Sequence, residues 1–282
     1  MSEAATGPAL FRPLTIRGVT LRNRVVVSPM CQYLAEDGRP GAWHMAHHAR
    51  FALGGVGAAI AEATAVTRDG RITHGCTGLY DDAQIAPWAA VTALYRAQGV
   101  ATGVQLNHAG GKGATQRPWE GAGALPLDGA EPAWECIGPS AVPVRPNFRP
   151  PRPATPAEID GVVAAFAGAA RRAVRAGFDL IELHGAHGYL LHAFLSPITN
   201  RREDEYGRDL PGRMKLPLRV AEAVRAAIPA DMPLFWRASL TDNMEGGLTL
   251  EDSLVLAREL KARGVDVMDC SAGGIAAPVS LS

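Results

Sequence analysis

The segment with the clearest capacity for chemistry holds His184, His187 and Tyr189 within six residues, with Gly185 and Gly188 between them. Two imidazole N–H groups can hydrogen-bond one oxyanion, and a nearby phenol can deliver a proton. Glycine neighbours let a ligand approach the backbone closely. A loop of solvated histidines is the simpler alternative, and a metal site would need a third ligand that is not obvious in the sequence. The pattern therefore favours a polar catalytic site.

Three other side chains could bind a ligand or react. Arg237 follows the apolar run Leu234–Trp236. A buried guanidinium needs an acceptor, which either a cofactor or a structural ion pair can supply. Gln105 is a weaker candidate, because a buried amide is often satisfied by backbone groups. Cys31 is either a reactive thiol or a small core residue, and its residue type alone favours the core.

The segment His44–His48 resembles a metal-binding cluster, because His44 and His48 lie four residues apart on one face of a predicted helix. The zinc motif HExxH would also need a glutamate between them. We therefore interpret the segment as a structural or surface helix, and we predict no metal site.

The candidate residues follow short apolar runs that recur in one pattern, which is a helix, a glycine, an apolar strand, and then polar or small residues. The predicted strands cover 24–27, 58–63, 100–106, 178–183, 234–236 and 265–269. Near-continuous apolar strands indicate burial on both faces, and their alternation with helices indicates a parallel α/β architecture. The glycine suits the residue after a helix end, and Thr155 and Thr249 are predicted N-caps.

The pattern alone is compatible with a doubly wound sheet or with a barrel. The turn 28–33 after the first strand lacks GxGxxG, which argues against a dinucleotide-binding sheet. The polar residues at the strand ends are Ser28, Glu62, Gln105, His184, Arg237 and Ser271. In a (β/α) barrel they would all converge on one mouth. The sequence therefore predicts an α/β fold of the TIM (β/α)8 type, with about six βα units present in this chain.

The composition fits one enzyme domain over residues 1–282, in which the Gly- and Pro-rich loop 107–153 is expected to cap the mouth. The formal net charge of zero gives no sign of nucleic-acid binding. The sequence contains no apolar stretch of about 18 residues, the length that would predict a membrane span. The 4 cysteines are far apart, which favours a reduced, cytoplasmic compartment.

Together these features resemble the Old Yellow Enzyme family of FMN-dependent ene-reductases, in the class of YqjM and xenobiotic reductase A. The resemblance runs from Leu10 to Gly274. The segments that carry it, in the family's order, are 24–33, 62–66, 105–110, 184–189 and 195–207. The thiol of Cys31 marks this class, because other classes usually carry threonine there. Gly111 departs from the pattern, since relatives often have arginine at that position.

The resemblance implies a role for each candidate residue. The implied FMN-binding residues are Ser28, Pro29, Met30, Cys31, Ala63, Gln105 and Arg237. His184 and His187 would hold the carbonyl or nitro oxygen of the substrate, with Tyr33 as a further contact. Tyr189 would be the proton donor. Cys31 would contact the substrate and tune the redox potential of the flavin. It is therefore counted with the catalytic residues.

The resemblance also implies a ping-pong reaction, in which NADPH or NADH reduces FMN and an activated alkene then receives the hydride. The implied partners are this small-molecule substrate and further copies of the chain, in a dimer or tetramer. One alternative is the barrel of a larger flavin/iron–sulfur enzyme of the dienoyl-CoA reductase type. Another is a truncated, non-catalytic fragment that cannot hold FMN.

The family's barrel has eight strands, two more than the sequence predicts here. In such barrels the phosphate site is often built by the loops after strands seven and eight. We therefore expect that the chain is truncated at its C-terminus or that its barrel is completed from elsewhere. The residues that bind the FMN phosphate would lie in that missing part.

Overall fold

The computed structural model describes residues 8–146 and 148–275, and its central element is a parallel β-sheet. The strands of this sheet are β3 (Val26–Val27), β4 (Ala58–Ala65), β5 (Ala101–Asn107), β8 (Leu180–Gly185), β9 (Leu234–Ser239) and β10 (Val267–Ser271). Their order in the sheet is β10-β9-β8-β5-β4-β3, and every neighbouring pair is parallel. Strands that follow one another in the chain are thus neighbours in the sheet, as repeated βα units require.

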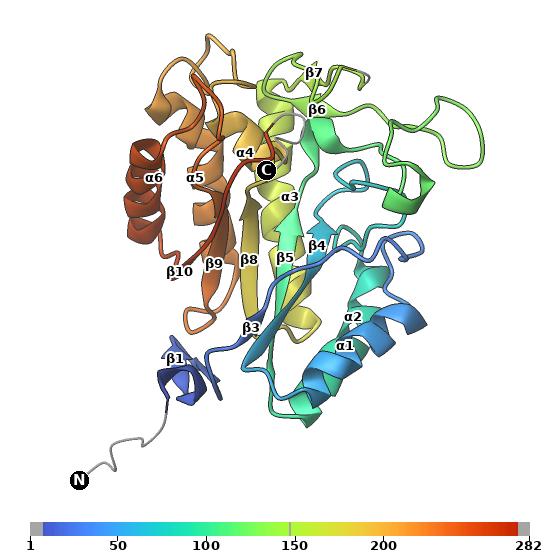
Figure 1. The fold of residues 1–282 in the computed structure, drawn as a ribbon, viewed down its shortest axis with the longest axis vertical. Helices are drawn as coiled ribbons and strands as arrows, with labels where there is room; N and C mark the ends of the chain where they lie inside the picture. The colour runs from blue at the N-terminus through green and yellow to red at the C-terminus, as the bar shows by residue number, and fades with distance from the viewer. Residues whose placement is uncertain (1–7, 147, 276–282) are drawn as a thin grey trace.

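Helices pack around the outside of the curved sheet (Figure 1). They are α1 (Ala42–Leu53), α2 (Ile85–Ala97), α3 (Pro156–Arg175), α4 (Leu190–Leu195), α5 (Leu210–Ala227) and α6 (Leu250–Ala262). At the start of α3, Oγ1 of Thr155 accepts the N–H of Glu158 at 3.3 Å. Gly99, Gly177 and Gly264 follow α2, α3 and α6 with φ of 64°, 83° and 85°. This left-handed geometry is what glycine supplies at a helix end, so the predicted cap and turn signals are confirmed.

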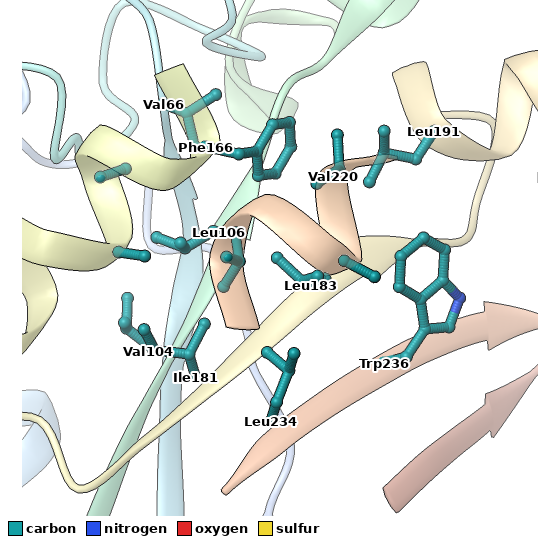
Figure 2. Close-up of a cluster of buried hydrophobic side chains, with 14 of the residues drawn as sticks. Val66, Val104, Leu106, Phe166, Ile181, Leu183, Leu191, Val220, Leu234 and Trp236 are labelled. Carbon is teal, nitrogen blue, oxygen red and sulfur yellow. The ribbon is translucent and has the colours of Figure 1, made fainter. Parts of the chain in front are cut away.

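Side chains alternate between the two faces of each strand, and this alternation separates the apolar core from the polar inner face. The strand residues in the core between sheet and helices are Val104, Leu106, Ile181, Leu183, Leu234 and Trp236 (Figure 2). Phe166 of α3 and Val220 of α5 belong to the same core. Because these neighbours point outward, the intervening residues Gln105, Glu182 and Arg237 point to the inner face.

A short antiparallel hairpin closes the N-terminal end of the sheet. It consists of β1 (Leu14–Ile16) and β2 (Val19–Leu21). Ile16 packs against Ile60, Leu180 and Phe235, which belong to β4, β8 and β9. This apolar floor leaves the C-terminal ends of the strands as the open mouth.

Within the described residues, β3 and β10 form the two edges of the six-stranded sheet, which curves into a half-barrel (Figure 1). The predicted α/β fold of the barrel type is confirmed, including all six predicted strands. In the same part of the chain, no helix is long and apolar enough to cross a membrane.

The segment between β5 and α3 extends over the C-terminal ends of the strands (Figure 1). Its regular elements are two 3-10 turns (Gly110–Lys112 and Pro118–Glu120) and the short parallel strands β6 (Ile137–Gly138) and β7 (Arg152–Pro153). An ion pair of 2.7 Å between Nη1 of Arg117 and Oε2 of Glu131 links two parts of this segment. Its location fits the capping role, which stays a prediction.

Candidate active site

Four neighbouring strands bring the predicted polar residues to the inner face. In the register of the sheet, Gln105 of β5 pairs with Glu182 of β8. His184 of β8 pairs with Arg237 of β9, which in turn pairs with Asp269 of β10. Because parallel strands end at the same edge, these residues meet at the mouth of the half-barrel, which is where chemistry occurs in this architecture.

His184, His187 and Tyr189 form one compact group at the end of β8. The ring centroids of His184 and His187 lie 5.2 Å apart, and those of His184 and Tyr189 lie 4.8 Å apart. His187 and Gly188 have φ of 60° and 76°, so the chain turns sharply between the histidine pair and the phenol. The predicted catalytic cluster is thus spatially as well as sequentially compact.

Both imidazoles of the cluster are neutral hydrogen-bonding groups. Nδ1 of His184 accepts the N–H of Ala186 at 3.3 Å, which leaves the ring hydrogen on Nε2. Nε2 of His187 lies 2.7 Å from Oγ of Ser271. Burial lowers the pKa of His184 well below its ordinary value, and His187 and Arg237 lower it further. Burial, with Arg237, also lowers the pKa of His187 to about 4.

The phenol of Tyr189 is held in its protonated form. Burial raises the pKa of Tyr189 well above its ordinary value, and the nearby thiols raise it further. Nζ of Lys112 lies 5.7 Å from the centroid of the Tyr189 ring. It donates to the carbonyl oxygens of His187 and Gly274 at 2.6 and 2.5 Å. Lys112 therefore secures the loop that presents Tyr189, a role that no local sequence signal indicates.

Cys31 and Tyr33 form the opposite wall of the site. Together with Tyr189 they pack against a small apolar cluster, whose members are Ala63, Ile72, Cys76 and Ala109. Burial raises the pKa of Cys31 well above its ordinary value, and Glu62 raises it further. Burial also raises the pKa of Tyr33. At neutral pH this wall therefore presents a thiol and a phenol, both uncharged.

The remaining predicted flavin-binding residues lie beside Cys31. Ser28, Pro29 and Met30 connect β3 to Cys31, and the side chain of Met30 is 47% exposed. Ala63 is buried on β4, and its backbone hydrogen-bonds Cys31. The structure thus brings Ala63 against Cys31 and leaves Met30 accessible from outside.

Arg237 is paired and still has an unused donor. Its Nη1 lies 3.1 Å from Oδ2 of Asp269, so the structural ion pair considered from the sequence is present. Its Nε is buried and has no hydrogen-bond partner among the described residues. Leaving a buried N–H without an acceptor is costly, so Nε suits an acceptor on a bound molecule.

The amide of Gln105 is held by a side chain, not by backbone groups. Its Nε2 donates to Oε1 of Glu182 at 2.8 Å. Burial raises the pKa of Glu182 to about 8, and Asp269 raises it too. The inner face thus carries Gln105 in a fixed orientation.

The histidines of α1 are buried and structural, while Trp43 and Leu53 of the same helix are exposed at the surface. Nδ1 of His48 lies 2.8 Å from Oη of Tyr95, and both side chains are buried. Nε2 of His44 lies 3.3 Å from Oε1 of Glu62. Throughout residues 8–146 and 148–275, no group of three or more His, Cys, Asp and Glu side chains is arranged to hold a metal ion.

Behind the cluster lies a buried network that no sequence motif indicates. Nε2 of His192 lies 2.9 Å from Oδ1 of Asp242, and Oγ of Ser196 donates to Oδ2 at 2.6 Å. The N–H of Gly188 donates to Nδ1 of His192 at 2.8 Å. This network anchors the turn before Tyr189 to the segment after β9. Local patterns do not reveal it, because its members are distant in sequence.

The site opens into a cavity of about 160 Å³, which Tyr33, Lys112 and Tyr189 line together with residues of the long loop. The cavity is therefore bounded by phenols, by the cations Lys112 and Arg145, and by the capping segment. It can admit a small molecule next to the proton-bearing groups.

Several known proteins are similar to this chain in sequence and fold. Residues 9–280 match the NADH:flavin oxidoreductase / NADH oxidase family. An NADPH dehydrogenase from Geobacillus sp. (strain WCH70) is 42% identical over 268 residues, which are 94% of this chain and 73% of that protein. Morphinone reductase in complex with tetrahydroNAD is 28% identical with a TM-score of 0.80, over 93% of this chain and 73% of that one. An Old Yellow Enzyme homologue from Zymomonas mobilis is 26% identical with a TM-score of 0.79, over 93% and 72% of the two chains.

The match spans nearly the whole chain and includes every segment on which the resemblance rests. FMN and NAD(P)H, expected from the sequence, are the cofactors of this group of enzymes. The chain belongs to the NADH:flavin oxidoreductase / NADH oxidase family and is an NAD(P)H-dependent flavin oxidoreductase of the Old Yellow Enzyme type.

Proposed function

We propose that this enzyme reduces the activated C=C bond of α,β-unsaturated carbonyl or nitro compounds. The observation that carries the proposal is the group of two neutral imidazoles and a protonated phenol at the end of β8. Reduction of such an alkene develops negative charge on an oxygen and needs a proton on carbon. Neutral N–H donors suit the first requirement and a phenol suits the second.

The residues present fit FMN as the resident cofactor. Nε of Arg237 is a buried donor that no described residue accepts from, as a flavin ring acceptor would require. Gln105, on strand β5, offers an amide whose orientation is fixed by its hydrogen bond to Glu182 of β8. Cys31 and Ala63 would border the ring, with Ser28, Pro29 and Met30 continuing along it. When bound, FMN accepts hydride from NAD(P)H and passes it to the alkene.

The side chains of this protein would perform the other tasks. His184 and His187 hold the carbonyl or nitro oxygen and stabilise its developing charge. Tyr33 contacts the same activating group, and Tyr189 transfers its phenolic proton to the α-carbon. Cys31 contacts the substrate and tunes the redox potential of the flavin, and the long loop 107–153 covers the site. The homo-oligomeric state and the cytoplasmic location stay predictions from the sequence.

A half-reaction experiment tests the function. The purified chain is incubated with FMN, freed of unbound cofactor, and titrated without oxygen. We expect a retained flavin spectrum that NADPH bleaches and that an α,β-unsaturated ketone restores, with the saturated ketone as product. A chain that retains no FMN would favour the non-catalytic alternative. Bleaching without any recovery by carbonyl or nitro alkenes would contradict the proposed substrate class.

Replacing His184 with alanine should weaken binding of a phenol to the FMN-loaded protein by roughly 10–100-fold. The change removes a hydrogen bond to a charged oxygen, which contributes about 1.5–3 kcal/mol. Spectral titration with a substituted phenol measures the Kd. His74→Ala serves as control, because His74 bonds the carbonyl of Pro132 in the loop region. Equal affinity of the His184→Ala variant and the unchanged enzyme would count against the oxyanion site.

A further inference from the structure

Glu62 occupies an unusual position for an acidic side chain, because it lies within β4 and is only 2% exposed. Its Oε2 accepts the backbone N–H of Gln32 at 2.9 Å. Its Oε1 faces Nε2 of His44 on α1 at 3.3 Å. A buried carboxylate without such partners would be strongly destabilising. Glu62 therefore links β4, helix α1 and the turn that follows β3.

The side chain of Glu62 acts as a hydrogen-bond acceptor. Nδ1 of His44 accepts the N–H of Gly41 at 3.0 Å. The ring hydrogen of His44 is therefore on Nε2, the atom that faces Glu62. Oε2 of Glu62 accepts the N–H of Gln32, while Oε1 lies 3.3 Å from Nε2 of His44 without a hydrogen bond among the described residues.

The residue next to Gln32 is Cys31, and the Glu62 carboxylate acts electrostatically on its thiol. The titratable groups that act on Cys31 come from three elements: Glu62 on β4, Cys76 in the segment after β4, and Tyr33 on its own turn. Tyr189 approaches from the loop after β8. Burial raises the pKa of Cys31 most, and the Glu62 carboxylate raises it further. Burial likewise raises the pKa of Cys76 to about 11, so Cys76 carries no charge at neutral pH.

We propose that Glu62 is a positioning residue of the active site, which fixes the turn that carries Cys31 through its bond to Gln32 and places near Cys31 a carboxylate that disfavours a second negative charge there. A thiolate here would add a negative charge to the pocket in which His184 and His187 stabilise a developing oxyanion. The benefit of an uncharged Cys31 to the enzyme rests on the proposed function. The arrangement of Glu62, Gln32 and Cys31 stands independently of bound FMN.

Alkylation of Cys31 in the protein without FMN tests the proposal. Iodoacetamide reacts with the thiolate, so its rate at fixed pH reports the ionised fraction. Mass spectrometry of the tryptic peptide 25–50 isolates Cys31, because that peptide contains no other cysteine. We expect Glu62→Gln to raise the rate at pH 8 about tenfold, which corresponds to a thiol pKa lower by about one unit. The amide keeps the size of the side chain and an acceptor for the N–H of Gln32.

Glu62→Asp separates charge from packing, because it keeps the charge and shortens the side chain. We expect its Cys31 to react within about twofold of the wild-type rate. Cys136 is the internal reference for folding, because the charged groups with the largest effect on its thiol are Asp69, Arg149 and Glu135. An unchanged rate in Glu62→Gln would overturn the proposal. So would a tenfold rise in Glu62→Asp, since loosened packing would then explain both variants. Neither measurement depends on FMN or turnover, so failure here is distinguishable from failure of the proposed function.

Discussion

Replacing Tyr189 with phenylalanine should slow alkene reduction by about 10²–10⁴-fold, which is the usual contribution of a positioned general acid. Oxidation of NADPH in the first half-reaction should keep its wild-type rate, because that step needs no proton from the phenol. The ring of Tyr189 packs 4.8 Å from His184, and phenylalanine preserves this contact. Stopped-flow measurement of the two half-reactions separates the effects.

Tyr33→Phe is the matched control for this prediction, because Tyr33 is a second, partly buried phenol in the same cavity. We expect it to raise KM for the alkene and to leave the rate of the proton-dependent step within about tenfold of wild type. If Tyr189→Phe reduced alkenes at the wild-type rate, Tyr189 would not be the proton donor. If Tyr33→Phe showed the larger loss, the roles of the two phenols would be reversed.

Replacing Asp242 with alanine should lower the free energy of unfolding by about 3–5 kcal/mol, because several buried donors lose their acceptor and each unsatisfied one costs about 1–3 kcal/mol. The change leaves the ring N–H of His192, the hydroxyl of Ser196 and the backbone N–H of Leu248 without their acceptor. Urea unfolding measures the loss. Because His192 also holds the N–H of Gly188, the turn before Tyr189 should become less ordered.

The contribution of Asp242 to the free energy of unfolding should depend on pH. Burial raises its pKa, but hydrogen bonds from His192, Leu248 and Ser196 outweigh this and hold the pKa of Asp242 below its ordinary value. A depressed pKa in the folded state means that the contribution is fully present above the unfolded pKa of about 3.9. It is lost as the pH falls through the folded pKa. The difference between wild type and Asp242→Ala should therefore be constant near neutral pH and shrink below about pH 4.

A surface ion pair provides the control for Asp242. Oδ1 of Asp160 lies 2.7 Å from Nη2 of Arg219, and the Asp160 side chain is 64% exposed. Asp160→Ala should cost less than about 1 kcal/mol, because water screens an exposed pair. A similar loss in both variants would contradict a special structural role for the buried network.

The sequence predicted the fold well because its strongest signals are local. Apolar strands, the glycine after each helix and the cap at Thr155 depend on residues a few positions apart. Side-chain alternation then places Gln105 and Arg237 on the inner face and Trp236 in the core. The cluster His184–Tyr189 was visible for the same reason, since its members share one strand end and one turn.

The tertiary structure alone decided which distant side chains meet. Glu62 ends up against His44 and the N–H of Gln32, and Arg237 against Asp269. Such pairs depend on how strands and helices pack, so no residue pattern within a single element predicts them. The sequence by itself thus determined the barrel-type fold, the strand-end positions and the candidate catalytic residues. Only the packed chain determined their protonation, their orientation and the buried charges that hold them, because burial and neighbouring groups set those properties.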